Sequence, residues 1–174
     1  MSTASRDPLV FLHDQNEALK AKGLHFGLRV LDEEQKPVTS FDGRTVINLS
    51  SNNYLGLTTH RVLRRAALDA TRRWGVGAAA VRTIAGTMRL HMELEEQIAR
   101  FKNTEACVVF QSGFTANAGT VAAILGADDL IISDELNHAS IIDGCRLSKA
   151  AVRVFQHKNL EDCQRICRET SAWP

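Results

Sequence analysis

Apolar residues recur along this chain with the spacings of amphipathic helices and of short strands. In the first part of the chain, this spacing predicts helices at residues 8–22, 60–74 and 88–101. The third helix is expected to expose a polar face that carries Glu93, Glu95, Glu96 and Arg100. Between the first two helices, Asp42-Gly43 lies among alternating apolar positions, which predicts a short hairpin over residues 37–48.

From residue 107 onward, short apolar runs alternate with stretches of helical spacing. The runs predict strands at residues 107–110, 130–132 and 152–155. The stretches between and after them predict helices at residues 114–125, 138–149 and 160–168. This alternation is typical of an α/β architecture with a largely parallel sheet and flanking helices.

Two polar features of this part of the chain suggest a binding site. Ser112 and Gly113 form a tight turn before a helix, where free backbone N–H groups suit a phosphate. The strand at residues 130–132 ends in an acidic and amide cluster, with His138 behind it. Because open α/β sheets usually hold ligands at the carboxyl edge, both features are expected to face one site.

Composition excludes several classes of protein. The 174 residues suffice for one domain with a real core, and the net charge of +1 gives no reason to expect nucleic acid or an anionic membrane as a partner. No apolar run approaches the roughly 18 residues of a membrane span. The four cysteines match no zinc pattern and follow no secretory signal, which favours reduced thiols in the cytoplasm.

Four motifs that could carry other chemistry have better structural interpretations. The run at residues 75–80 fits the dinucleotide pattern G-x-G-x-x-A, but a helix rather than a strand precedes it. Asp134 and His138 have the spacing of a metal pair and no third ligand nearby. Ser112 lacks the nucleophile elbow G-x-S-x-G. Lys149 falls at a helix end, where its charge offsets the terminal carbonyl groups.

Five motifs in order carry a resemblance to a known family. They are SNNYLGL at residues 51–57, AVRTIAGT at 80–87, HMELE at 91–95, QSGFTAN at 111–117 and SDELNHASIIDG at 133–144. Together they resemble the first half of the α-oxoamine synthases, which are pyridoxal 5'-phosphate (PLP) enzymes of fold type I. The resemblance implies an N-terminal arm at residues 1–48 and a truncated PLP-binding large domain at residues 49–174.

The resemblance also implies roles for individual residues. The backbone amides of Gly113 and Phe114 match those that hold the cofactor phosphate, with Ser112 and Asn137 as secondary contacts. His138 matches the histidine that stacks on the pyridine ring beside the substrate. Two further residues match substrate contacts: Asn52 near the amino-acid carboxylate, and Arg82 in the loop that shapes the acyl-CoA end of the site.

The activity implied by the resemblance is the condensation of glycine or alanine with an acyl-CoA in a homodimeric enzyme. The run NHASIIDG favours the glycine C-acetyltransferase branch, with 8-amino-7-oxononanoate synthase of biotin biosynthesis as the alternative. A third hypothesis, from another class, is a non-catalytic half-domain that associates with a full-length homologue.

The chain spans only part of the family's pattern. The lysine that forms the Schiff base and the aspartate that pairs with the pyridine nitrogen come later in the family, and Lys149 does not match that lysine. We therefore expect a fragment or a frame-shifted product that is inactive by itself. The last residues, 171–174, differ from the family and motivate the frame-shift hypothesis.

Overall fold

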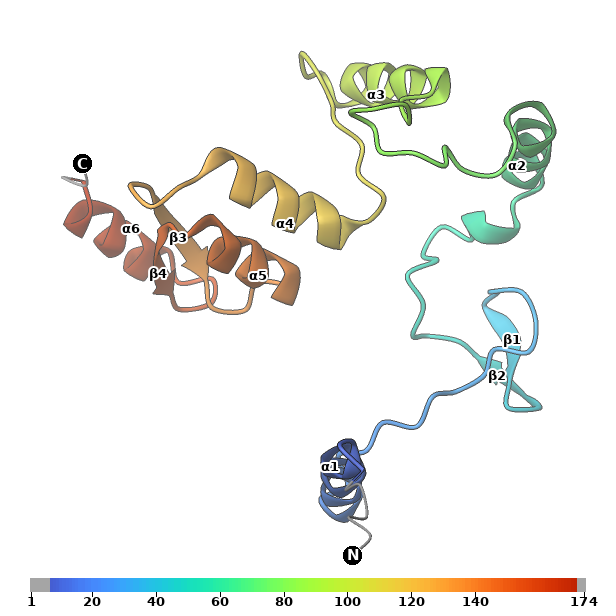
Figure 1. Ribbon diagram of the computed structural model, residues 1–174, viewed down its shortest axis with the longest axis horizontal. Helices are drawn as coiled ribbons and strands as arrows, with labels where there is room; N and C mark the ends of the chain where they lie inside the picture. Colours follow the sequence, from blue (N-terminus) through green and yellow to red (C-terminus); the bar gives the residue numbers. More distant parts are fainter. Residues whose placement is uncertain (1–6, 172–174) are drawn as a thin grey trace, which may run out of the picture. The chain divides into compact units, whose positions relative to one another are not determined.

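A computed structural model describes residues 7–171 and divides the chain into two units at Gly77–Ala78. We describe each unit by itself (Figure 1). The predicted boundary between residues 48 and 49 concerns the complete large domain and remains a prediction. Residues 172–174, on which much of the frame-shift hypothesis rests, lie outside the described part.

The first unit contains helix α1 (Val10–Ala21), strands β1 (Val38–Phe41) and β2 (Arg44–Ile47), the 3-10 turn η1 (Leu57–Thr59) and helix α2 (Arg61–Trp74). The strands form the predicted antiparallel hairpin. Asp42 and Gly43 both have positive φ angles, of 51° and 73°, which a two-residue hairpin turn favours. The Asp32 carboxylate fixes this turn, since it accepts a hydrogen bond from the Gly43 amide at 2.8 Å.

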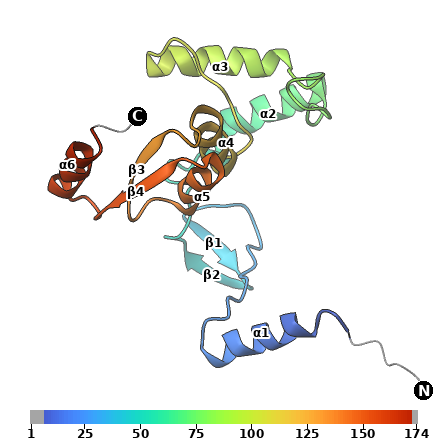
Figure 2. The ribbon, with the colours of Figure 1, turned by 60° about the vertical axis from the view of Figure 1, so that its left-hand side comes forward.

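The second unit contains the elements around the predicted site. They are helices α3 (Arg89–Lys102), α4 (Gly113–Ile124), α5 (Ala139–Ser148) and α6 (Leu160–Glu169), and strands β3 (Leu130–Asp134) and β4 (Ala151–Phe155). β3 and β4 pair in parallel, from Leu130 opposite Ala151 to Asp134 opposite Phe155, and α5 is the crossover between them (Figure 2). This confirms the predicted α/β alternation, with a parallel sheet of two strands in the described residues.

Helices α4 and α5 pack closely and run in the same direction. Asn117 of α4 bonds to Ser140 of α5, and one turn further along Val121 lies beside Gly144. The contact requires glycine at position 144. A Cβ atom there would lie 2.9 Å from the Asn117 carbonyl oxygen and 3.2 Å from the Cα atom of Ala118. The starts of the two helices therefore lie at the same end of the pair.

The structure contradicts the strand predicted at residues 107–110. This segment follows α3 without joining a ladder, and Val108 is 69% exposed. Its apolar, β-branched sequence suits a buried parallel strand, but such a strand needs a hydrogen-bonded neighbour. None of the strands in residues 7–171 pairs with it.

One residue of the predicted polar face of α3 is also placed differently. Glu95 is only 9% exposed, whereas Glu93, Glu96 and Arg100 are exposed as expected. Helical spacing alone assigned Glu95 to solvent, and an ion pair to the half-buried Arg82 reverses that assignment.

No helix of residues 7–171 combines the length and the apolar character needed to cross a membrane.

Gly144→Ala is expected to destabilise the chain by about 1–3 kcal/mol, because the added methyl group meets backbone atoms and forces α4 and α5 apart. Chemical denaturation measures this change. Gly119→Ala in α4 is the matched control, since its methyl group meets only the Phe110 ring at 3.2 Å, which can move. A gain in stability from Gly144→Ala, as alanine gives in an uncrowded helix, would contradict the close approach.

Candidate functional site

The start of α4 presents two backbone donors. Ser112 is the N-cap: its Oγ accepts a hydrogen bond from the Thr115 amide at 3.1 Å, and its carbonyl oxygen accepts one from the Ala116 amide at 3.0 Å. The amides of Gly113 and Phe114 have no acceptor within the helix, because the residues four positions before them lie outside it. They are therefore free to bind an anion, which the positive end of the helix dipole also favours.

His138 lies at the start of α5. It is the N-cap residue of this helix, and its ring Nδ1 accepts a hydrogen bond from the Ser140 amide at 3.1 Å. The side chain is exposed, so one face of the imidazole can contact a planar ligand. Because α4 and α5 run in the same direction, His138 lies at the same end of the helix pair as Gly113 and Phe114.

The loop between β3 and His138 is held by Asp134. Its carboxylate accepts hydrogen bonds from the His157 ring at 2.8 Å, the Leu136 amide at 2.8 Å and the Lys158 amide at 3.1 Å. These bonds, with that of His157 foremost, lower the pKa of Asp134 to about 2. Asp134 is thus a structural anion that ties the turn after β3 to the turn after β4.

Asn137 and Ser133, which flank this loop, form a hydrogen bond with each other. The Asn137 side-chain amide donates to Ser133 Oγ at 2.9 Å, and Ser133 is only 7% exposed. This bond fixes the turn that leads to His138. Among residues 7–171, no group of three or more His, Cys, Asp or Glu side chains is placed to hold a metal ion.

Arg82 is anchored by a carboxylate that sequence reasoning placed in solvent. Its two terminal nitrogens donate to the two oxygens of Glu95 at 2.9 and 3.2 Å. Glu95 also accepts a hydrogen bond from the Val109 amide at 3.0 Å. The Arg82 guanidinium, followed by the Val109 amide, lowers the pKa of Glu95, and Glu95 raises that of Arg82. Glu95 is the last residue of the motif HMELE. The sequence signal for its burial is Arg82 in the preceding loop, which supplies the opposite charge.

Asn52 belongs to the first unit. Its side chain is exposed, and its Oδ1 accepts a hydrogen bond from the Tyr54 hydroxyl at 3.4 Å. The neighbouring Asn53 is instead bound internally, to the Thr58 hydroxyl at 2.8 Å. Asn52 is therefore accessible to a ligand within its unit.

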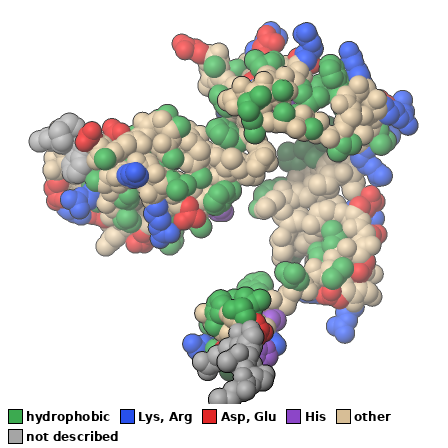
Figure 3. All heavy atoms as spheres, in the orientation of Figure 1, with side chains coloured by type: hydrophobic (Ala, Val, Ile, Leu, Met, Phe, Trp, Pro, Cys, Tyr) green, Lys and Arg blue, Asp and Glu red, His purple; other side chains and the backbone are tan. Residues whose placement is uncertain are grey.

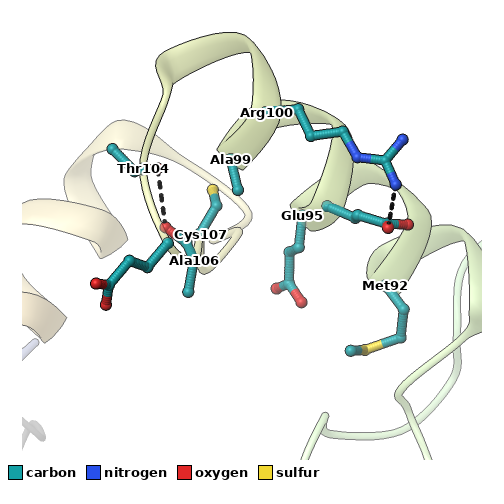
Figure 4. A pocket seen from close by; sticks show the side chains of 9 residues that line it. Met92, Glu95, Ala99, Arg100, Thr104, Ala106 and Cys107 are labelled. Atoms are coloured by element: carbon teal, nitrogen blue, oxygen red, sulfur yellow. Dashed lines mark hydrogen bonds and ion pairs between the residues drawn. The ribbon is translucent and has the colours of Figure 1, made fainter.

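A pocket of about 420 Å³ lies against α3 and the segment that follows it (Figure 4). Its walls come from α3 residues such as Met92 and Ala99, and from Thr104 to Cys107. None of the residues predicted to bind cofactor or substrate lines it. The pocket is thus separate from the candidate site at the starts of α4 and α5.

Comparison with known proteins identifies the class of protein. The family model Aminotransferase class I and II matches residues 44–171. The chain belongs to this family. Its relatives place it in the N-terminal part of the α-oxoamine synthases, as the motifs predicted.

Three relatives illustrate the match. The chain is 53% identical over 161 residues to 8-amino-7-oxononanoate synthase of Thermoanaerobacter pseudethanolicus, covering 92% of this chain and 41% of that protein. It is 53% identical over 146 residues to 8-amino-7-oxononanoate synthase/2-amino-3-ketobutyrate coenzyme A ligase of Thermus thermophilus, covering 84% and 37%. A solved structure of the serine palmitoyltransferase variant K265A from S. paucimobilis, with a bound PLP–myriocin aldimine, matches 97% of this chain and 44% of its own, with a TM-score of 0.83 and 29% identity.

These matches confirm the predicted fold type I and the N-terminal position of the chain in its family. The chain spans about two fifths of the length of the curated relatives that it matches. The predicted roles of the individual site residues remain predictions. These residues are Ser112, Gly113, Phe114, His138, Asn52 and Arg82.

The low pKa of Asp134 gives a pH dependence with a defined sign. A carboxyl whose pKa is lower in the folded state than its ordinary 3.8 stabilises the fold above that value, and this contribution is lost as the pH falls toward about 2. Asp134→Asn is therefore expected to lower the free energy of unfolding at pH 6, and the difference from wild type should shrink between pH 4 and 2. Denaturation at several pH values measures it. Asp143→Asn, which removes an exposed pair with Arg146, is the control.

The partly buried pair of Arg82 and Glu95 gives a second prediction for this unit. Glu95→Gln removes the charge that holds both Arg82 and the Val109 amide. We expect faster hydrogen exchange at Val109 and in the loop of residues 81–87, measured by mass spectrometry. Glu96→Gln is the matched control, because Glu96 is exposed and pairs with Arg100 on its own helix. Equal effects of the two substitutions would contradict the anchoring role of Glu95.

Proposed function

We propose that the 174 residues form the N-terminal part of a PLP-dependent acyltransferase of the 8-amino-7-oxononanoate synthase type. The observation that carries this proposal is the 53% identity over 161 residues to the Thermoanaerobacter enzyme. It corrects the order of preference drawn from the run NHASIIDG, which put glycine C-acetyltransferase first. The five motifs together are strong evidence for the family. The single run NHASIIDG is weaker evidence for one branch of it over another.

Residues at the shared end of α4 and α5 fit the cofactor. The Gly113 and Phe114 amides would bind the phosphate of PLP, with the Ser112 hydroxyl beside them. His138 would stack on the pyridine ring, since its side chain is exposed at the start of the neighbouring helix. When bound, PLP supplies an electron sink for negative charge at the α-carbon of an amino acid.

The substrates follow from the product named for the relatives. In 8-amino-7-oxononanoate the amino group and the ketone occupy adjacent carbons. Alanine that loses its carboxyl group supplies carbons 8 and 9, and the thioester of a seven-carbon dicarboxylic acid supplies the remainder. In this proposal Asn52 contacts the amino-acid carboxylate, and the loop held by Arg82 and Glu95 shapes the acyl-CoA end of the site.

A second candidate is glycine C-acetyltransferase activity, which forms 2-amino-3-ketobutyrate from glycine and acetyl-CoA. The observation in its favour is the 53% identity to the Thermus thermophilus protein, whose name includes both activities. One enzyme of broad specificity would satisfy both candidates.

The surface of the chain favours association with further protein. Apolar side chains lie on the surface of both units (Figure 3). In the second unit, Phe114, Leu147, Val152 and Val154 are between 40% and 62% exposed. We propose that the complete enzyme covers such residues as a homodimer. The four cysteines are free thiols, which fits a cytoplasmic location.

A chimera tests the proposed activity. This chain would replace the matching 161 residues of the Thermoanaerobacter enzyme, which supplies the remainder of the fold. We expect turnover of alanine with a pimeloyl thioester. Faster turnover of glycine with acetyl-CoA would favour the second candidate. A folded chimera that binds PLP and turns over neither pair would contradict both, and the isolated chain is expected to show no turnover.

Gly113→Pro in the chimera tests the phosphate site. Proline is well tolerated at the first position of a helix, and the extended backbone of Ser112 suits a residue before proline. The substitution removes one amide donor to a charged group, worth about 1.5–3 kcal/mol, so PLP affinity should fall roughly 10- to 100-fold. Absorbance titration measures the affinity, and circular dichroism should show unchanged helix content. Unchanged affinity would place the phosphate elsewhere.

A further inference from the structure

The hydrogen bonds around His138 determine which of its two ring nitrogens carries the proton. The Ser140 backbone amide lies 3.1 Å from Nδ1 and donates a hydrogen bond to it. A backbone N–H can only donate, so Nδ1 must be the unprotonated nitrogen of the ring. The neutral imidazole therefore carries its proton on Nε2, the nitrogen on the far side of the ring from Ser140.

A second bond to the same nitrogen comes from the side chain of Ser140. Its Oγ lies 2.6 Å from Nδ1, and the residue is only 1% exposed. The Asn117 side-chain amide, on α4, donates to this Oγ at 2.9 Å. Because Asn117 occupies a lone pair of the hydroxyl, the hydroxyl proton is available for Nδ1. The bonds thus run in one direction, from Asn117 to Ser140 to His138.

We propose that Ser140 is a positioning residue that holds His138 in the Nε2–H tautomer and fixes the orientation of its ring, and that the Asn117 amide directs the Ser140 hydroxyl proton toward Nδ1. The consequence is a directed donor at Nε2, beside the proposed cofactor ring, for an anionic group such as a substrate carboxylate. This consequence rests on the proposed function. The tautomer itself follows from bonds within the chain and does not depend on it.

The arrangement also links the two helix starts. Asn117 belongs to α4, whose first amides are proposed to bind phosphate, and His138 caps α5. The bond from Asn117 to Ser140 is possible because Gly144 lets the helices approach closely. The orientation of the ring is therefore set by the same packing that positions the phosphate donors.

Nuclear magnetic resonance of the ¹⁵N-labelled chain tests the proposal. Long-range correlation of the ring protons with the ring nitrogens, at a pH where the ring is neutral, separates the two tautomers. In the wild-type chain we expect the His138 Nδ1 resonance at the downfield position of an unprotonated nitrogen and the Nε2 resonance upfield. The reverse pattern, or averaged shifts, would overturn the proposal without any variant.

Two substitutions at one position supply the matched comparison. Asn117→Asp offers only acceptors, so the Ser140 hydroxyl should turn toward it and present a lone pair to Nδ1. We expect the two nitrogen shifts to move toward each other. Asn117→Leu removes the amide but leaves the hydroxyl free to donate to Nδ1, so the wild-type pattern should persist. Equal shifts in both variants would indicate a purely structural role and overturn the proposal.

Ser148→Ala is the control on the same helix, since Ser148 is buried and its hydroxyl bonds to the backbone of Cys145 and Ala150. It should leave the pattern unchanged, and a shift as large as that of Asn117→Asp would count against the proposal. In the chimera, Ser140→Ala should raise KM for the amino acid more than it lowers kcat. If the unsubstituted chimera has no activity while the chain shows the Nε2–H pattern, the proposed function is overturned and the tautomer assignment stands.

Discussion

The close packing of α4 against α5 determines the geometry of the candidate site. Gly144 presents no side chain to the Asn117 carbonyl group, so the two helices lie side by side and begin at the same end. One helix contributes amide donors at its start, and the other contributes the imidazole that caps it. Two aligned helix dipoles also place positive potential at this end, which suits a ligand with a phosphate group. Any change that separated the helices would alter the donors, the ring and the local field together.

Much of this fold is encoded in local patterns. The Asp42-Gly43 turn, the amphipathic helices and the βαβ unit around α5 all follow from residues that are close in sequence. The start of α4 was also predictable, because a serine cap followed by glycine is a local signal. These features depend on intrinsic backbone preferences, which a short window of sequence contains.

The features that sequence reasoning missed depend on residues distant in the chain. Glu95 is buried because Arg82 and the Val109 amide, 13 and 14 residues away, both require its carboxylate. The segment at residues 107–110 has the composition of a strand, but pairing is a property of two segments and not of one. The bond between Asn117 and Ser140 spans 23 residues and joins two helices, so neither motif alone indicates it. The branch of the family was difficult for a related reason, since the motifs describe chemistry that all its members share.

Asp134 joins parts of the chain that meet only at the end of the sheet. Its carboxylate binds the turn after β3 through the Leu136 amide and the turn after β4 through His157 and Lys158. The two turns are thereby tied to each other before any ligand arrives, and the loop that carries His138 has few conformations left to lose. Binding at this edge would then cost little conformational entropy, so a small polar cofactor could be held by few contacts. The anchoring carboxylate would contribute to affinity without touching the ligand.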